Sequence, residues 1–190
     1  MSTIKANYLL DAAGTGAPSF TNGMKSDVFR DLSDVERARF ASGYFRLASG
    51  GIQFNGDTAA ANALNDYEEG NWTPVIIGET TAGTGTYTTQ VGSYTKIGRF
   101  VFLSCTVAWT AHTGTGNMSI TGLPFTVGAF SVGNLIYSNL TVPAGAIAGC
   151  YSDFSLSKLV MVSTPTGAGS IAALAIDTAA TLYIGISYRI

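Results

Sequence analysis

The stretch "RFVFLSCTVAWT", residues 99–110, alternates between strongly apolar and mixed positions along its whole length. In an extended chain, successive side chains point to opposite sides, so Val101, Leu103, Cys105, Val107 and Trp109 would share one face. The final stretch "ATLYIGISYRI" repeats the pattern, with Leu182, Ile184, Ile186 and Tyr188 facing inward. Val, Ile, Thr, Tyr and Gly dominate both stretches, which favours strand over helix. The chain therefore contains β-strands that bury one face.

Further strand-like runs, such as "FSLSKLVMVST" and "GAFSVGNLIYSNLTV", follow Trp72. Glycine-rich turns such as "TAGTGT" and "HTGTGN" separate the runs. Roughly eight short strands with such turns are typical of a sandwich or jelly roll. We predict a mainly β protein whose residues 71–190 form a jelly-roll-like antiparallel β-sandwich as an outer domain.

The first 23 residues contain Gly14, Gly16, Pro18 and Gly23, which cannot continue a helix. An extended arm this short cannot bury its own apolar side chains, so it must lie on something larger or be disordered, and we expect it to dock. The expected docking residues are Ile4, Tyr8, Leu9, Leu10 and Phe20.

Residues 24–70 would connect the arm to the outer domain, beginning with a short helix over residues 24–42. Ser33 and Glu36 fit a capping box, and apolar residues recur near one helical face. A small hairpin is expected over residues 43–62, with its turn at "SGG". Its two strands would carry Tyr44, Phe45 and Leu47 on one side of that turn, and Ile52 and Phe54 on the other.

Charged residues make up only 12% of the chain, against about 25% in typical proteins. A surface with so few charges suggests burial against other subunits, and we expect an oligomer or a place in a larger particle. A monomer with a hydroxyl-rich surface is the alternative. The net charge is −2 and the basic residues are scattered, which argues against nucleic-acid binding. Neither a membrane-spanning apolar run nor a secretory signal is evident, so folding in a cytoplasm is expected.

Cys105 and Cys150 both lie in apolar, strand-like surroundings, which favours buried reduced thiols. A disulfide would require neighbouring strands, and the sequence leaves that open. One histidine and two distant cysteines do not offer zinc-ligand spacing, so we expect no metal or other cofactor.

Three carboxylates cluster in "NDYEEGNWTP", namely Asp66, Glu68 and Glu69. In an extended segment, Asp66 and Glu68 would share a side at about 7 Å, a separation compatible with an inverting glycosidase. The other interpretation is a solvated junction at which Trp72 begins the core of the outer domain. His112 would have to serve any Ser–His–Asp triad, and no G-x-S-x-G motif supplies a nucleophile. We therefore predict a protein that is not an enzyme.

Two polar segments, "TAHTGTGN" and "SVGNLIYSN", are candidates for ligand-contacting loops. Hydroxyl, amide and aromatic groups in loops between rigid strands suit polar ligands such as glycans. The candidate contact residues are His112, Thr113, Asn117, Asn134 and Asn139.

Three motifs together resemble a module of structural appendage proteins from tailed bacteriophages. They are "DYEEGNWTP" (66–74), "YTTQVGSYTKIG" (87–98) and "GLPF" (122–125). The opening "TIKANYLLDAAGTGAPSFTNG" resembles the particle-proximal end of phage tail fibres. This resemblance implies a virion protein, commonly a homotrimer, with an amino-terminal anchor and a β-rich part that projects outward. It transfers no catalytic residue.

The resemblance leads us to expect a short trimeric tail fibre or adhesin in the virion, attached to other virion proteins and contacting a host surface glycan. Long fibres usually have a shaft, and this chain shows none. A capsid decoration protein, acting as cement or head fibre, is therefore the main alternative. A glycan depolymerase acting through the clustered carboxylates is a lesser alternative.

Overall fold

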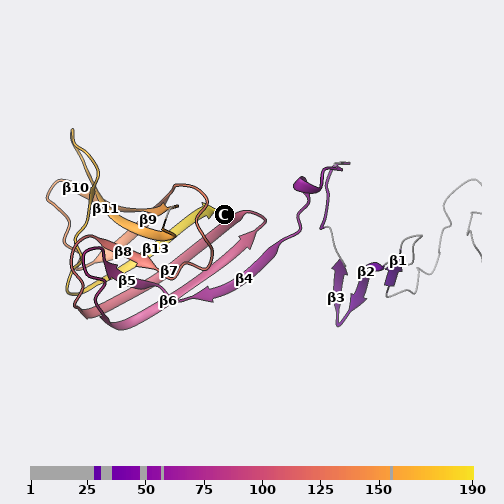
Figure 1. The fold of residues 1–190 in the computed structure, drawn as a ribbon, viewed down its shortest axis with the longest axis horizontal. Helices are drawn as coiled ribbons and strands as arrows, with labels where there is room; N and C mark the ends of the chain where they lie inside the picture. The colour runs from indigo at the N-terminus through magenta and orange to yellow at the C-terminus, as the bar shows by residue number, and fades with distance from the viewer. Residues whose placement is uncertain (1–27, 31–35, 48–50, 57, 155) are drawn as a thin grey trace, which may run out of the picture. The chain divides into compact units, whose positions relative to one another are not determined.

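The computed structural model describes residues 28–30, 36–47, 51–56, 58–154 and 156–190. They fall into a small unit, Met1–Gly51, and a large unit, Ile52–Ile190, which are described in turn. Across those ranges the chain is almost entirely β-strand (Figure 1), and the one helical element is a 3-10 turn, η1 (Ala60–Asn62). No helix in the described ranges is long and apolar enough to cross a membrane.

The small unit contains a three-stranded antiparallel sheet in the order β1-β2-β3. Its strands are β1 (Val28–Arg30), β2 (Glu36–Ala41) and β3 (Tyr44–Leu47). Ser42 and Gly43 join β2 to β3 with φ angles of 52° and 80°. Two successive positive φ angles are what a tight hairpin turn requires, and Gly43 adopts its angle without steric cost.

The predicted helix over residues 24–42 is wrong where the structure describes it, because residues 28–30 and 36–41 are strands. Glu36, the expected end of the capping box, opens β2, while Ser33 lies outside the described residues. The physical reason is that the segment after the turn pairs with residues 36–41 as a strand. Ala38 lies opposite Leu47, and Phe40 lies opposite Phe45. This cross-strand pairing would be lost if residues 36–41 were helical.

The predicted hairpin at "SGG" is also wrong in its pairing. Tyr44–Leu47 pairs backward with β2 and not forward with Ile52. Ile52 instead forms an isolated antiparallel bridge with Leu64, with backbone hydrogen bonds of 2.9 and 2.8 Å. The segment before β4 is thereby closed into a loop that contains η1.

The large unit contains one ten-stranded antiparallel sheet, in the order β4-β6-β7-β13-β9-β10-β11-β8-β5, with β12 paired to β11. The strands are β4 (Tyr67–Trp72), β5 (Val75–Gly78), β6 (Gly85–Ile97), β7 (Phe100–His112), β8 (Met118–Thr121), β9 (Ser131–Ser138), β10 (Ala146–Asp153), β11 (Lys158–Pro165), β12 (Ala172–Ala173) and β13 (Ala180–Arg189). The first of them, β4, begins inside the carboxylate-rich segment and ends at the buried Trp72. Figure 1 shows the sheet curling so that its two halves face each other.

The core lies between those halves. On one side are the inward residues predicted from alternation on β7 and β13, all at most 6% exposed. On the other side are Ile76, Met118, Ile120, Leu159 and Met161 of β5, β8 and β11, each at most 1% exposed. The predicted mainly β, sandwich-like antiparallel fold is confirmed.

Side chains close the curled sheet by joining its last strand, β5, to β6 and β7. The Ile76 amide donates to the Tyr87 hydroxyl at 2.9 Å, and Gln90 Nε2 donates to the Pro74 carbonyl at 2.8 Å. His112 Nε2 lies 3.1 Å from the Ile76 carbonyl. These contacts satisfy backbone groups that an edge strand would otherwise present to other chains.

Both cysteines lie in the core as free, buried thiols, as predicted. Burial raises the pKa of Cys105 to about 12 and that of Cys150 to about 11, because the apolar surroundings disfavour a thiolate.

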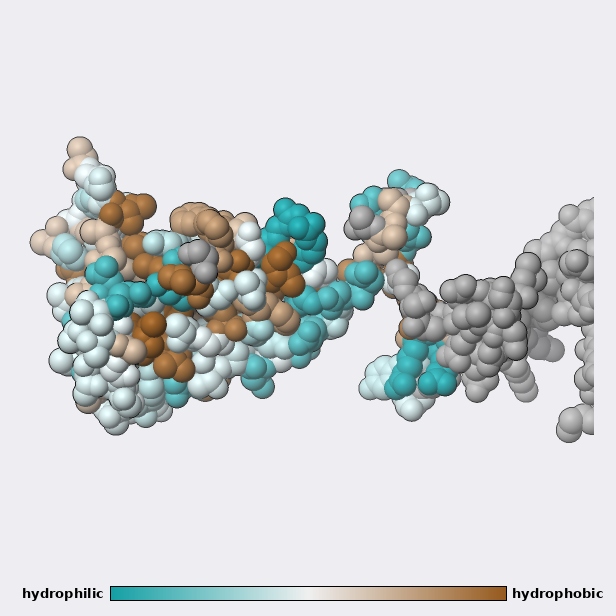
Figure 2. Space-filling model, in the orientation of Figure 1, coloured by the Kyte–Doolittle hydropathy of each residue, from teal (hydrophilic) through white to brown (hydrophobic). Residues whose placement is uncertain are grey.

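Tyr188 is fully buried and donates its hydroxyl to the Phe125 carbonyl at 3.1 Å. Apolar residues also reach the surface. Figure 2 shows brown residues in several places among pale ones on the large unit.

Candidate functional site

The clustered carboxylates lie at the edge of the large sheet, on or just before β4. Because β4 alternates and Trp72 faces the core, Glu68 and Gly70 share its inward face with Asp66, while Glu69 points outward. In the register, Glu68 lies opposite Lys96, and Gly70 opposite Tyr94. The predicted common side for Asp66 and Glu68 therefore holds.

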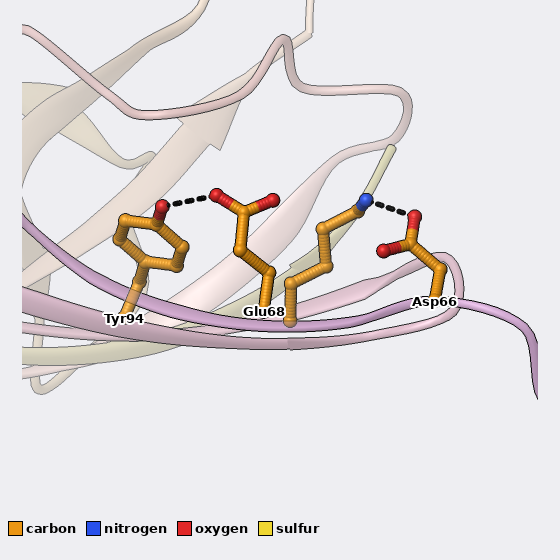
Figure 3. Close-up of polar contacts among 4 residues, drawn as sticks. Asp66, Glu68 and Tyr94 are labelled. Atoms are coloured by element: carbon orange, nitrogen blue, oxygen red, sulfur yellow. Dashed lines mark hydrogen bonds and ion pairs between the residues drawn. The ribbon is translucent and has the colours of Figure 1, made fainter. Parts of the chain in front are cut away.

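On that face each carboxylate already has a donor. Lys96 Nζ forms an ion pair with Asp66, and the Tyr94 hydroxyl donates to Glu68 at 2.5 Å (Figure 3). Lys96 is only 8% exposed, and its ammonium also lies 5.1 Å from the centre of the Phe125 ring. The hydrogen bond to Glu68 raises the pKa of the Tyr94 hydroxyl. These contacts hold β4 onto β6.

On the other face of β4, Glu69 accepts a hydrogen bond from the Tyr67 hydroxyl, which raises the pKa of that tyrosine. Acidic groups thus lie on both faces of β4, which is the end strand of the described sheet. Charges along an edge discourage pairing with another strand. Each of the three carboxylates therefore has a side-chain partner on β4 or β6.

His112 is part of the closure of the sheet. Gly114 donates its amide to Nδ1 at 2.9 Å, so Nε2 carries the proton that faces the Ile76 carbonyl. Both ring nitrogens are therefore engaged by backbone. No group of three potential metal ligands occurs among the residues that the structure describes.

The remaining candidate ligand residues separate into two places. Thr113, Asn117 and Asn139 lie in or beside loops at one end of the sheet. Thr113 accepts a hydrogen bond from the Thr84 amide at 2.9 Å, and Asn117 bridges to Ala175. Asn139 follows the end of β9 with a φ of 58°. Asn134 instead lies within β9 and is exposed on the outer face of the sheet.

A groove of about 420 Å³ crosses that outer face over β6, β7, β13 and β9. Two cross-strand rows line it. They are Val91, Thr106, Tyr183 and Ile136 in the first, and Ser93, Ser104, Gly185 and Asn134 in the second. Ser93 and Ser104 hydrogen-bond to each other at 2.9 Å. Sequence reasoning missed this groove, although its residues are the outward set of the same alternation that identified the core.

The expected docking residues of the arm, from Ile4 to Phe20, lie outside the described residues. The candidate surfaces of the large unit are therefore the loop end and the outer groove.

Comparison with known proteins gives one informative likeness. The fold is similar to part of a solved structure described as "Crystal structure of Dettilon tailspike protein", with a TM-score of 0.53 and 19% sequence identity. The match covers 65% of this chain and 24% of that chain, so this chain corresponds to about a quarter of the tailspike's length. No family model matches the sequence, and no curated protein matches it. At this identity the likeness concerns the fold.

Proposed function

We propose that this chain is a structural protein of a phage virion, a short trimeric tail fibre or adhesin. The observation that carries the proposal is the fold of the large unit, which is similar to a segment of a phage tailspike. The motifs "DYEEGNWTP", "YTTQVGSYTKIG" and "GLPF" point to the same class independently of the fold. In this proposal, residues 1–23 attach the chain to the particle and the β unit projects outward.

The structural features of the large unit suit a passive role better than catalysis. Asp66, Glu68 and Glu69 each accept a hydrogen bond or ion pair from a side chain of β4 or β6, which suits a role in holding the edge strand. An inverting or retaining glycosidase needs two carboxyl groups that face one substrate. The loop end, with Thr113, Asn117 and Asn139, remains the place where we propose contact with a host glycan.

The location on the particle is tested by mass spectrometry of separated tails and heads from purified virions. The proposal expects the protein in the tail fraction and its absence from heads. Recovery with heads alone would replace the tail fibre with capsid decoration. Deletion of residues 1–23 should abolish incorporation into particles and leave the melting temperature of the β unit unchanged.

The absence of glycan cleavage is tested by incubating the full-length protein with capsular polysaccharide from the host. We expect no release of reducing ends. Release that disappears in the triple variant Asp66→Asn, Glu68→Gln, Glu69→Gln would identify the carboxylates as catalytic and contradict the proposal. The amide replacements keep the size of the side chains and one acceptor oxygen each, so they limit damage to β4.

A further inference from the structure

The outer face of the four strands β6, β7, β13 and β9 is unusually apolar for a surface. We define the outer apolar face by its large outward side chains, which are between 49% and 74% exposed: Val91, Phe100, Phe102, Val132, Ile136 and Tyr183. The cross-strand register places Val91, Tyr183 and Ile136 in one row, through Thr106. Phe102 lies opposite Ser187, two rows further along β13, and the row of Ser93, Ser104, Gly185 and Asn134 runs between. The apolar side chains therefore form two groups on either side of a row of small, uncharged residues.

The size of this face distinguishes it from ordinary surface. Large apolar side chains bury roughly 150–250 Å² when aromatic and less when aliphatic, so six of them at this exposure leave on the order of 600 Å² open. A specific interface covers about 800 Å² on each partner and mixes apolar with polar surface. The two apolar groups, with the uncharged row between them, make a face of roughly that size.

The charge distribution on the face also fits a partner of the same kind. The residues between the apolar ones are Ser93, Ser104, Thr106, Gly185 and Asn134, and none of these is charged. Charges appear only at the borders, with Glu69 on the edge strand β4 and Arg189 opposite Phe100 at the end of β13. An uncharged centre with a charged rim is typical of subunit interfaces, and such a face can lie against a neighbouring copy of the chain without burying an unpaired charge.

We propose that the outer apolar face binds a second copy of this chain. The groove across it can receive a side chain from the neighbouring copy, because Gly185 leaves open space where a side chain would stand. This inference rests on the proposed function in one respect, namely that the chain forms an oligomer. It adds which surface of the chain forms the contact. A polysaccharide is the competing occupant, because Phe100, Phe102 and Tyr183 offer rings on which a sugar can stack. The test below therefore also measures binding to immobilised host polysaccharide.

The test compares two lysine substitutions in the full-length protein. Ile136→Lys places a charge at the centre of the face, where Ile136 is 71% exposed. Ile171→Lys is the matched control, since Ile171 is 63% exposed and lies just before β12, away from the face. Light scattering coupled to size-exclusion chromatography over a dilution series measures the mass of each. Val132→Lys, at a residue 74% exposed, serves as a second face variant should Ile136→Lys fail to fold by circular dichroism.

We expect an oligomeric wild type, an unchanged Ile171→Lys variant, and at least a tenfold rise in the dissociation constant for Ile136→Lys, because a buried unpaired charge opposes association. A wild type with a mass of 19.7 kDa at every concentration would overturn the inference, while the particle location tested by mass spectrometry would stand. If both face variants keep the wild-type mass, the oligomer forms elsewhere and the inference is wrong. If the face variants keep the wild-type mass and lose binding to immobilised host polysaccharide, the face binds a glycan and the inference is wrong.

Discussion

The two faces of strand β13 share one backbone but differ strongly in exposure to solvent. Leu182, Ile184 and Tyr188 point inward and are between 0% and 4% exposed. Tyr183 points outward and is 49% exposed, beside Gly185, which has no side chain. Both faces carry apolar groups, yet only the inward one is covered by the chain's own strands. The inward face therefore determines whether the protein folds, and the outward face is free to determine what it binds.

The largest expected effect comes from truncating neighbouring residues on the two faces. Leu182→Ala should lower the free energy of unfolding by about 2–5 kcal/mol, because it leaves a cavity in a close-packed core. Tyr183→Ala should change it by about 0.5 kcal/mol or less, because its side chain loses few contacts within one chain. Urea unfolding of both variants in the Ile136→Lys background, where association is weakened, provides the measurement. Equal losses would show that the outward face also stabilises the single chain.

A second pair of variants adds a methyl group to a glycine. An alanine Cβ at Gly92 would lie 2.3 Å from Trp72 Nε1, whose indole covers that position and donates to the Ser104 carbonyl. At Gly185 nothing lies within 4 Å of the added Cβ. Gly92→Ala should therefore cost about 1–3 kcal/mol through overpacking. Gly185→Ala should be neutral or gain a few tenths of a kcal/mol, because a glycine is lost from the unfolded chain.

Melting temperatures of the two glycine variants would be compared at equal protein concentration in the same Ile136→Lys background. A destabilised Gly185→Ala variant would show that the outer face is more tightly packed than its exposure indicates. A neutral Gly92→Ala variant would show that Trp72 moves aside readily and does not anchor β4.

The third comparison concerns the two partners of one ion pair, which are buried to different degrees. The Lys96 side chain is 10% exposed and the Asp66 side chain 44%. Asp66→Ala leaves a buried ammonium without its partner and should cost about 1–2 kcal/mol. Lys96→Met keeps the apolar stem against Phe125, and the exposed carboxylate regains water, so a smaller loss is expected. Chemical denaturation of both variants measures the asymmetry, and the reverse order would contradict it.

Alternation allowed much of the large unit to be predicted, because it depends on local geometry alone. The inward positions from Val101 to Trp109 and from Leu182 to Tyr188 are all buried. The strand order was not predictable in the same way. Strand β13 lies between β7 and β9, although it is the last strand in the chain, and such distant pairing leaves no mark on either segment. The helix predicted over residues 24–42 failed for a different, local reason: β2 pairs with β3 across the two-residue turn at Ser42 and Gly43, and the helical pattern did not take that turn into account.

The site was harder to predict than the fold. The acidic cluster was found from sequence, but its partners were not, because Lys96 lies 30 residues from Asp66 and Tyr94 lies 26 from Glu68. His112 was expected in an exposed loop, and only the curled sheet brings it to the Ile76 carbonyl. The outer apolar face was visible as the outward half of the alternation. Its four strands become neighbours only through the long-range order of the sheet.

The smallest expected effect concerns a second ion pair, between Lys158 and Glu79, at 2.8 Å. Its lysine is as buried as Lys96, and its carboxylate is 33% exposed. The hydrogen bond from Lys158 holds the pKa of Glu79 below its ordinary value of 4.5. A carboxyl group with a lowered pKa stabilises the folded state above its unfolded pKa, and this contribution is lost as the pH falls through the folded pKa.

Glu79→Gln should therefore be less stable than wild type near neutral pH, by about 1 kcal/mol or less for a partly exposed pair. The difference should shrink as the pH falls below the ordinary glutamate pKa of 4.5, because wild-type Glu79 then becomes neutral too. Melting temperatures across this range measure the change. In a Lys158→Met background, the loss of stability caused by Glu79→Gln should be much smaller at every pH. This control shows how much of the loss is due to the ion pair between Lys158 and Glu79. A difference between wild type and Glu79→Gln that stays constant into acid would show that the glutamate stabilises the fold by packing and not by its charge.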